Sequence, residues 1–198
     1  MNLRESFTHE LISSGIIDRS LKVGDFIPNF MLPNACGETI EVEKFLVNGP
    51  VVISFFRGSW CPFCNSELAA LQQALPAIKT LGASLIAISP QTNHHTSLTV
   101  EKHELTYEVL SDRNNKIARQ FGIVFQIPEY LRPVLAQKGH VLPRYNGDES
   151  FELPIPATFI VSQDGKVIYA FVDPDYTKRL DPIEIITVLR NLSVVSKS

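Results

Sequence analysis

A short apolar segment followed almost at once by two closely spaced cysteines constrains the fold of this chain more than any other feature. Residues 51–56 form a continuous apolar run, rich in β-branched and aromatic side chains and too short for a core helix, so they predict a buried central strand. In residues 62–81 apolar side chains recur every three or four positions, which predicts a helix ended by Gly82. Residues 84–89 predict a second buried strand. This succession indicates two parallel strands joined by a right-handed crossover.

The remaining segments extend this unit into an α/β sandwich with a mixed central sheet and flanking helices. Residues 27–42 predict an N-terminal hairpin extension with Cys36 in its turn. A second hairpin in residues 157–172 precedes a final helix opened by Asp181 and Pro182. The other predicted elements lie between the hairpins: a helix in residues 97–105, a strand at 107–110, and a helix from 112 to 121.

The chain predicts one domain with two additions. Its 198 residues, 44% of them hydrophobic and 20% charged, suit a single domain with an insertion better than two domains. Residues 1–20 predict a helical extension that docks on the same or a neighbouring subunit through four apolar side chains near one face: Leu3, Phe7, Leu11 and Ile16. Residues 21–198 form the predicted domain. Within it, the irregular residues 126–152, with one helix at 128–137, predict an insertion before the last hairpin.

Composition excludes several classes of protein. A net charge of -3 and scattered basic residues argue against nucleic-acid binding, which needs clustered Lys and Arg. No apolar run reaches the roughly 18 residues of a membrane helix, and the first 20 residues resemble neither a signal peptide nor an anchor. Three cysteines are too few for a disulfide framework. We therefore expect a reducing compartment, the cytoplasm, and no membrane or nucleic-acid partner.

The motif Cys61-Pro62-Phe63-Cys64 carries the chemistry. Cys61 falls at the N-cap of the predicted helix and Pro62 in its first turn, so the Cys61 sulfur lies beside unpaired backbone N–H groups. Helix N-termini lower a thiol pKa from about 8.5 to between about 3.5 and 7.5. The resulting thiolate attacks disulfides and peroxides. Cys64 lies one turn on, within reach of Cys61, so the pair predicts a reversible disulfide.

Two other interpretations of the cysteine pair fit the sequence less well. A structural zinc site usually needs four ligands, and only Cys36, His94 and His95 could complete one, without suitable spacing. Two structural core cysteines fit poorly with Trp60 and Pro62 at a strand-to-helix corner. Neither a metal nor a cofactor is therefore expected, and redox chemistry is favoured.

Other polar residues have an ordinary explanation beside a functional one. Cys36 fits a tolerated small residue on a loop, and the pair His94–His95 fits solvated loop side chains. The cluster before the last helix fits a turn held by Asx capping and a local ion pair: Asp173, Asp175, Tyr176 and Arg179. Arg57 follows the central strand, where its charge could stabilise the thiolate or polarise a peroxide oxygen. A solvent-facing arginine at a strand end is the alternative there.

Several segments in order along the chain match a known family: 22–25, 28–30, 55–64, 87–90, 110–112, 121–123, 156–159 and 164–165. With them the sequence resembles the peroxiredoxin-like family of the alkyl hydroperoxide reductase/thiol-specific antioxidant (AhpC/TSA) group, from about residue 10 to residue 190. The resemblance implies a thioredoxin-like fold and thiol-dependent reduction of hydroperoxides. It also implies that Pro156 is a cis-proline facing the active cysteines.

The active loop departs from the pattern of ordinary peroxiredoxins, Pro-x-x-x-Thr-x-x-Cys. An ungapped alignment places Arg57 at the proline, Cys61 at the threonine and Cys64 at the peroxidatic cysteine, and the family's arginine position near Pro156 is not filled. Local helix chemistry favours Cys61 as the nucleophile, whereas the resemblance favours Cys64. On the resemblance, we expect Cys64 to be oxidised first and Cys61 to be the resolving partner.

The sequence thus predicts a thiol-dependent antioxidant enzyme that reduces hydrogen peroxide or organic hydroperoxides through Cys61 and Cys64. Arg57, Trp60, Pro62 and Pro156 are the predicted supporting residues. Thioredoxin or another dithiol is the expected reductant, and a homodimer is a possible assembly. The alternatives are a thioredoxin-like disulfide oxidoreductase without significant peroxidase activity and a redox-sensing regulatory or binding protein.

Overall fold

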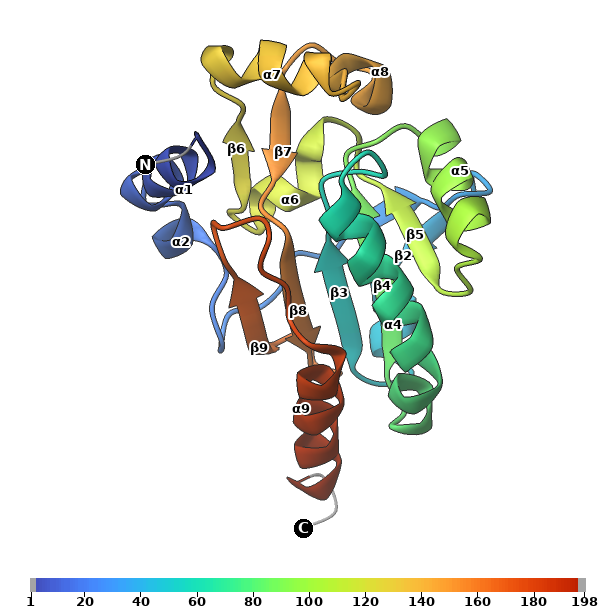
Figure 1. Cartoon of the computed structure of the whole chain (residues 1–198). Helices are drawn as coiled ribbons and strands as arrows, with labels where there is room; N and C mark the ends of the chain where they lie inside the picture. The colour runs from blue at the N-terminus through green and yellow to red at the C-terminus, as the bar shows by residue number, and fades with distance from the viewer. Residues whose placement is uncertain (1–2, 196–198) are drawn as a thin grey trace.

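The computed structural model describes residues 3–195 and has a five-stranded mixed sheet at its centre (Figure 1). Across the sheet the strands are β5 (Glu108–Ser111), β4 (Ser84–Ser89), β3 (Val51–Phe55), β8 (Ala157–Val161) and β9 (Val167–Val172). The pairs β3–β4 and β4–β5 are parallel, whereas β8 runs antiparallel to both β3 and β9. The predicted βαβ unit and the mixed α/β fold are confirmed.

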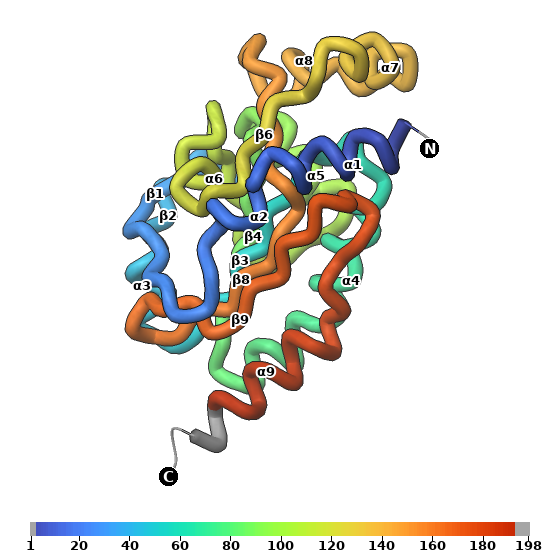
Figure 2. The backbone as a smooth tube through the Cα atoms, turned by 90° about the vertical axis from the view of Figure 1, so that its left-hand side faces the viewer, coloured from blue at the N-terminus to red at the C-terminus, as the bar shows by residue number. Residues whose placement is uncertain are grey.

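Helices cover both faces of this sheet. On one side α4 (Pro62–Thr80) packs beside α9 (Pro182–Val195), and Figure 2 shows both helices on the same side of the strands. The opposite side carries α6 (Lys116–Gln120), α3 (Val42–Leu46) and the hairpin of β1 (Met31–Pro33) and β2 (Thr39–Glu41). All five residues of β3 are buried, so the strand that leads into the cysteine motif is anchored in the core.

The N-terminal segment packs on its own chain. It forms α1 (Leu3–Ser13) and α2 (Ile16–Arg19), which bury Phe7, Leu11 and Ile16. The Phe7 ring lies 5.6 Å from the ring of Phe125, measured between centroids. Leu3, the fourth residue of the predicted apolar face, stays half exposed, and residues 1 and 2 lie outside the described part of the chain.

The segment predicted as an insertion rises from the end of the sheet that bears the cysteines (Figure 1). Two short antiparallel strands, β6 (Val124–Gln126) and β7 (Glu152–Pro154), form its base. Between them lie the 3-10 turn η2 (Glu129–Leu131), α7 (Arg132–Gln137) and α8 (Leu142–Asn146). Tyr130 donates a hydrogen bond of 2.7 Å to the Glu10 carboxylate, which links this segment to α1.

Three local predictions are corrected. The helix α5 (Asn93–His103) begins before residue 97 and includes His94 and His95, because Thr92 caps it by accepting a hydrogen bond from the His95 N–H. Residue 42 opens α3 and does not extend the hairpin. Asp112 does accept N–H groups at the start of α6, as predicted, but across the intervening turn η1 (Arg113–Asn115).

The peptide bond before Pro156 is trans, so the expected cis-proline is wrong. The chain runs from β7 into β8 without reversing, and the Ile155 N–H donates to the Ile123 carbonyl oxygen at 2.8 Å. A cis X–Pro bond typically serves a tight turn, whereas the trans form fits this extended passage between the two sheets.

No helix within residues 3–195 is both long and apolar enough to cross a bilayer.

Replacing Phe7 with alanine tests whether the N-terminal helix is part of the core. We expect Phe7→Ala to lower the free energy of unfolding by about 3 kcal/mol, because the substitution leaves a cavity against Phe125. The matched control is Ile12→Ala on the same helix, where the side chain is 55% exposed and the expected loss is below about 0.5 kcal/mol. Urea denaturation measures both, and equal effects would contradict the assignment.

Candidate active site

The two cysteines lie where the chain leaves the central sheet. Cys61 is the N-cap of α4, with extended backbone, and Pro62 occupies its first turn. Gly58, with φ +147°, shapes the preceding loop, since a Cβ there would lie 2.5 Å from the Trp60 indole nitrogen. Cys64 is in the first turn of the helix. Both thiols are free, and neither residue has exposed surface.

Arg57 points inward and supports Cys61. Its guanidinium Nη2 donates a hydrogen bond of 3.0 Å to the Cys61 sulfur, and the residue is only 6% exposed. The same guanidinium lies 4.0 Å from the centroid of the Tyr176 ring and 4.9 Å from that of Trp60. The alternative of a solvent-facing arginine is therefore wrong.

The two thiols differ in their affinity for a proton. The pKa of Cys61 falls to about 5, because its thiolate accepts a hydrogen bond from the Cys64 side chain and is attracted by the Arg57 charge, which together outweigh the effect of burial. Burial raises the pKa of Cys64 well above its ordinary value, and the neighbouring Cys61 raises it further. At neutral pH the pair thus holds one thiolate, on Cys61, and one thiol, on Cys64.

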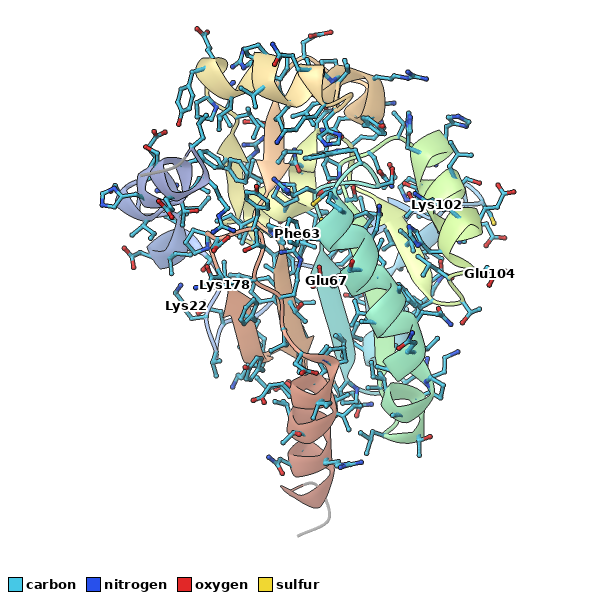
Figure 3. All side chains as sticks on the ribbon, viewed as in Figure 1. Lys22, Phe63, Glu67, Lys102, Glu104 and Lys178 are labelled. Carbon is cyan, nitrogen blue, oxygen red and sulfur yellow. The ribbon has the colours of Figure 1, made fainter. Side chains whose placement is uncertain are left out.

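A second arginine reaches Cys64 from the far end of the chain. Arg179 Nη2 lies 3.4 Å from the Cys64 sulfur, and its Nε lies 2.7 Å from a carboxylate oxygen of Glu67. Glu67 is on α4, one turn beyond Cys64, and Figure 3 labels it near the amino-terminal end of that helix. Burial raises the pKa of Glu67 to about 7, even though Arg179 opposes the shift.

Sequence reasoning missed this arrangement in part. The Asx capping predicted before the last helix is present at Asp173 and Asp175, which each accept the N–H two residues on, and Lys178 makes an ion pair of 3.2 Å with Asp173. However, Arg179 is not part of that ion pair, because it reaches across to α4. Glu67 could have been noticed as an acidic residue on the apolar face of a predicted helix, three positions after Cys64.

A pocket of about 480 Å³ lies against the cysteine loop. Arg57, Trp60, Pro62, Phe63 and Tyr176 form its inner wall, and side chains from α1 and from the segment after β6 form its outer wall. Cys61 is not itself exposed in the pocket, although its two chain neighbours and its arginine partner line it.

The remaining candidates from the sequence are Pro156, Cys36 and the histidine pair. Pro156 is buried immediately before β8, and Cys36 is exposed in the β1–β2 turn. His95 lies in the first turn of α5, and its ring packs against that of Tyr145 with 4.8 Å between ring centroids.

Arg57→Met tests the origin of the Cys61 thiolate. Loss of the positive charge and of the hydrogen bond is expected to raise the pKa of Cys61 from about 5 toward its ordinary value, so its alkylation at pH 6 should slow severalfold. Iodoacetamide labelling from pH 4 to 9, read by mass spectrometry, measures this. Arg119→Met, at a surface ion pair, should leave the profile unchanged. A wild-type profile in Arg57→Met would remove Arg57 from this role.

Glu67→Gln tests the second arginine. Without a carboxylate partner, the Arg179 charge acts on Cys64 alone, so the pKa of Cys64 should fall. Its thiolate fraction at a fixed pH should rise about tenfold for each unit by which the pKa falls. We expect faster closure of the Cys61–Cys64 disulfide with diamide at pH 8, and loss of an inflection near pH 7 where Glu67 ionises. The control Glu101→Gln, on the exposed face of α5, should retain the inflection. An inflection that survives in Glu67→Gln would have another source.

Comparisons with known proteins agree with this fold. The model of the AhpC/TSA family matches residues 23–170. The chain is 29% identical over 156 residues to the chloroplastic peroxiredoxin Q of Triticum aestivum, covering 77% of this chain and 71% of that protein. It is 24% identical over 152 residues to the thiol-disulfide oxidoreductase ResA of Bacillus thuringiensis, covering 76% and 70%.

Among solved structures, peroxidoxin BcpB from Mycobacterium tuberculosis superposes with a TM-score of 0.69 at 22% identity, covering 87% of this chain and 98% of that one. This likeness shows a shared fold. Because the family model covers most of the chain, the protein belongs to the AhpC/TSA family and has the thioredoxin-like fold of its peroxiredoxins.

Proposed function

We propose that this protein is a thiol peroxidase that reduces hydroperoxides with Cys61 as the attacking sulfur and Cys64 as the resolving one. The observation that carries the proposal is the Cys61 thiolate, with a pKa of about 5 and an arginine at 3.0 Å, beside a protonated Cys64. Thiolates are the reactive species toward peroxides, so this pair has one sulfur ready to attack and one held in reserve.

The reaction balances with these two residues and an external dithiol. The Cys61 thiolate attacks the terminal oxygen of the hydroperoxide: an S–O bond forms, the O–O bond breaks, and the alkoxide or hydroxide released takes up a proton. The sulfur is oxidised to sulfenic acid and the peroxide is reduced to an alcohol or water. Cys64 then attacks the sulfenic sulfur, which forms the disulfide and releases water. A dithiol such as thioredoxin reopens the disulfide by exchange.

Arg57 suits both stages of the first step. Its guanidinium stabilises the attacking thiolate in the ground state, and a cation beside the same sulfur also favours the negative charge that develops on the departing oxygen. Since the Cys61 sulfur is covered, a peroxide reaches it only after a side chain of the pocket wall moves.

This order of oxidation reverses the one expected from the family resemblance. That expectation placed the first oxidation at Cys64, at the family's peroxidatic position. The burial of Cys64 and its raised pKa favour the thiol there, which is the less reactive form. The alignment shows that Cys64 occupies the family's peroxidatic position. In this chain, however, Cys61 and its partner Arg57 place the negative charge on the other sulfur.

A disulfide oxidoreductase is the second candidate function. It is favoured by the Cys-x-x-Cys pair at a helix N-terminus and by the similarity to a ResA protein. Both functions use Cys61 as the nucleophile and need the pair reduced, so we place the protein in a reducing compartment such as the cytoplasm.

Single-cysteine variants separate these assignments. In stopped-flow mixing with hydrogen peroxide or tert-butyl hydroperoxide, Cys64→Ser should accumulate sulfenic acid at Cys61, while Cys61→Ser should react at least tenfold more slowly. In the wild type, mass spectrometry should locate the loss of two hydrogens to the peptide that contains both cysteines.

The opposite pattern in the two variants would restore Cys64 as the first oxidised sulfur. No peroxide reaction in any form, together with rapid reduction of insulin disulfides by the wild type, would reject the peroxidase and leave the disulfide oxidoreductase. Cys36→Ser is the matched control, because that thiol is exposed in the β1–β2 turn, and it should behave as the wild type.

A further inference from the structure

The first oxidation step releases a strong base beside Cys61. When the Cys61 thiolate attacks a hydroperoxide, an alkoxide or hydroxide leaves. An acid that protonates such an oxygen in the transition state accelerates a reaction by about 10²–10⁴-fold. Arg57 favours the developing charge, but a guanidinium is not deprotonated in proteins and gives up no proton. An acid in this pocket therefore has to be another side chain.

His140 is the one residue of the pocket lining, within residues 3–195, whose side chain type gains and loses a proton near neutral pH. The Cys64 thiol keeps its proton but does not line the pocket. The other ionisable side chains of the lining are arginine, lysine and tyrosine, residue types that ordinarily lose their proton at about pH 10 or above: Arg4, Arg57, Lys138 and Tyr176.

The end of α7 fixes the position of His140. Gly139 has φ +80°, and the His140 N–H donates to the Leu135 carbonyl oxygen at 2.9 Å, as in a Schellman helix end. From there the His140 ring packs against the indole of Trp60, with 5.1 Å between ring centroids, and Trp60 directly precedes Cys61. His140 is partly exposed, so its ring can recover a proton from solvent. The imidazole thus lies on the pocket wall that adjoins the cysteine loop.

The charges around His140 set the pH range in which it holds a proton. Burial lowers the pKa of His140 below its ordinary value; the negative charge of Cys61 opposes this shift, and the charges of Lys138 and Arg57 add to it. His140 also lines an adjoining pocket of about 260 Å³, and no carboxylate within residues 3–195 lines either pocket. The other charged or titratable side chains of the two linings are Arg4, Tyr176 and Arg132.

We propose that His140 is the catalytic acid of the first oxidation step, whose imidazolium gives its proton to the oxygen that leaves when Cys61 attacks a hydroperoxide. The S–O bond forms as the O–O bond breaks, the sulfur is oxidised to sulfenic acid, and the leaving oxygen departs as an alcohol or as water. The neutral imidazole then takes a proton from solvent. This role rests on the proposed peroxidase function. It is carried by the place of His140 against Trp60 and by the lack of another suitable acid in the lining.

His140→Gln tests the role through the pH dependence of the reaction. The step needs Cys61 as thiolate and His140 as imidazolium. The wild-type rate constant should therefore rise with pH through about 5, where Cys61 ionises, and fall as the pH passes the lowered pKa of His140. In stopped-flow mixing of the reduced protein with tert-butyl hydroperoxide, His140→Gln should be slower by about tenfold or more at pH 5.5. At pH 9 it should match the wild type, which has no imidazolium there. A variant that keeps the wild-type fall would reject the role.

The leaving group separates acid catalysis from a change in the shape of the pocket. Peracetic acid releases acetate, a weak base that needs no proton, whereas tert-butyl hydroperoxide releases a strongly basic alkoxide. At pH 5.5, His140→Gln should therefore slow the reaction with tert-butyl hydroperoxide and leave that with peracetic acid within about twofold of the wild type. His140→Phe, which keeps a ring against Trp60, should behave in the same way. Equal loss with both peroxides would reject the proton transfer.

Two controls follow the rest of the site. Alkylation of Cys61 by iodoacetamide releases iodide and needs no acid, so its rate at pH 8 should be unchanged in both His140 variants. Slower alkylation would assign His140 to support of the thiolate and overturn its role as the acid. His95→Gln is the matched control, because His95 is also partly exposed, packs against an aromatic ring and has a lowered pKa, but does not line this pocket. It should keep the wild-type pH profile.

The two levels of the argument fail in different ways. A wild type that reacts with neither peroxide would reject the peroxidase function together with this role. A wild type that reacts with both, while His140→Gln and His140→Phe keep its pH profile, would reject His140 as the acid and leave the peroxidase in place.

Discussion

The negative charge on the Cys61 sulfur depends on groups that the fold holds around it. β3 is buried throughout and delivers Arg57 and Cys61 to the same corner of the sheet, where the guanidinium donates to the sulfur at 3.0 Å. The Cys64 thiol supplies a further hydrogen bond, and α4 begins at this point. Because the corner is closed to water, each of these interactions is stronger than it would be at the surface. The same closure keeps the sulfur covered until a wall side chain moves.

Each cysteine of the pair has its own arginine neighbour. Arg57 stabilises the anion on Cys61, whereas Arg179 lies against Cys64 but shares its charge with Glu67. The pair is therefore asymmetric before any reaction, with the charge held on the first sulfur. This asymmetry suits a cycle in which one cysteine attacks and the other responds, whether the oxidant is a peroxide or a disulfide.

The N-terminal helix and the inserted segment form part of the pocket beside the cysteines. α1 and the segment between β6 and β7 add no strand to the five-stranded sheet, yet they form the outer wall of the pocket beside the cysteines. Tyr130 and Glu10 link the two additions to each other, and His140 links the second to Trp60. The family resemblance describes the frame shared with peroxiredoxins. Of the two segments that form the outer wall, α1 was predicted as a helix from its apolar face, whereas the segment between β6 and β7 had the least regular sequence pattern.

Local sequence patterns were sufficient for the βαβ unit, the hairpins and the helix opened by Cys61, because each depends on periodicity and end signals over a few neighbouring residues. They also identified both cysteines and Arg57, which lie within eight positions of each other. Only the tertiary structure decided that Arg57 points inward, that Arg179 meets Glu67 and Cys64, and that Pro156 is trans. Arg179 and Cys64 are 115 positions apart, and their contact exists because α9 packs beside α4 across the same face of the sheet. No local pattern encodes such a meeting, since it follows from the packing of whole elements.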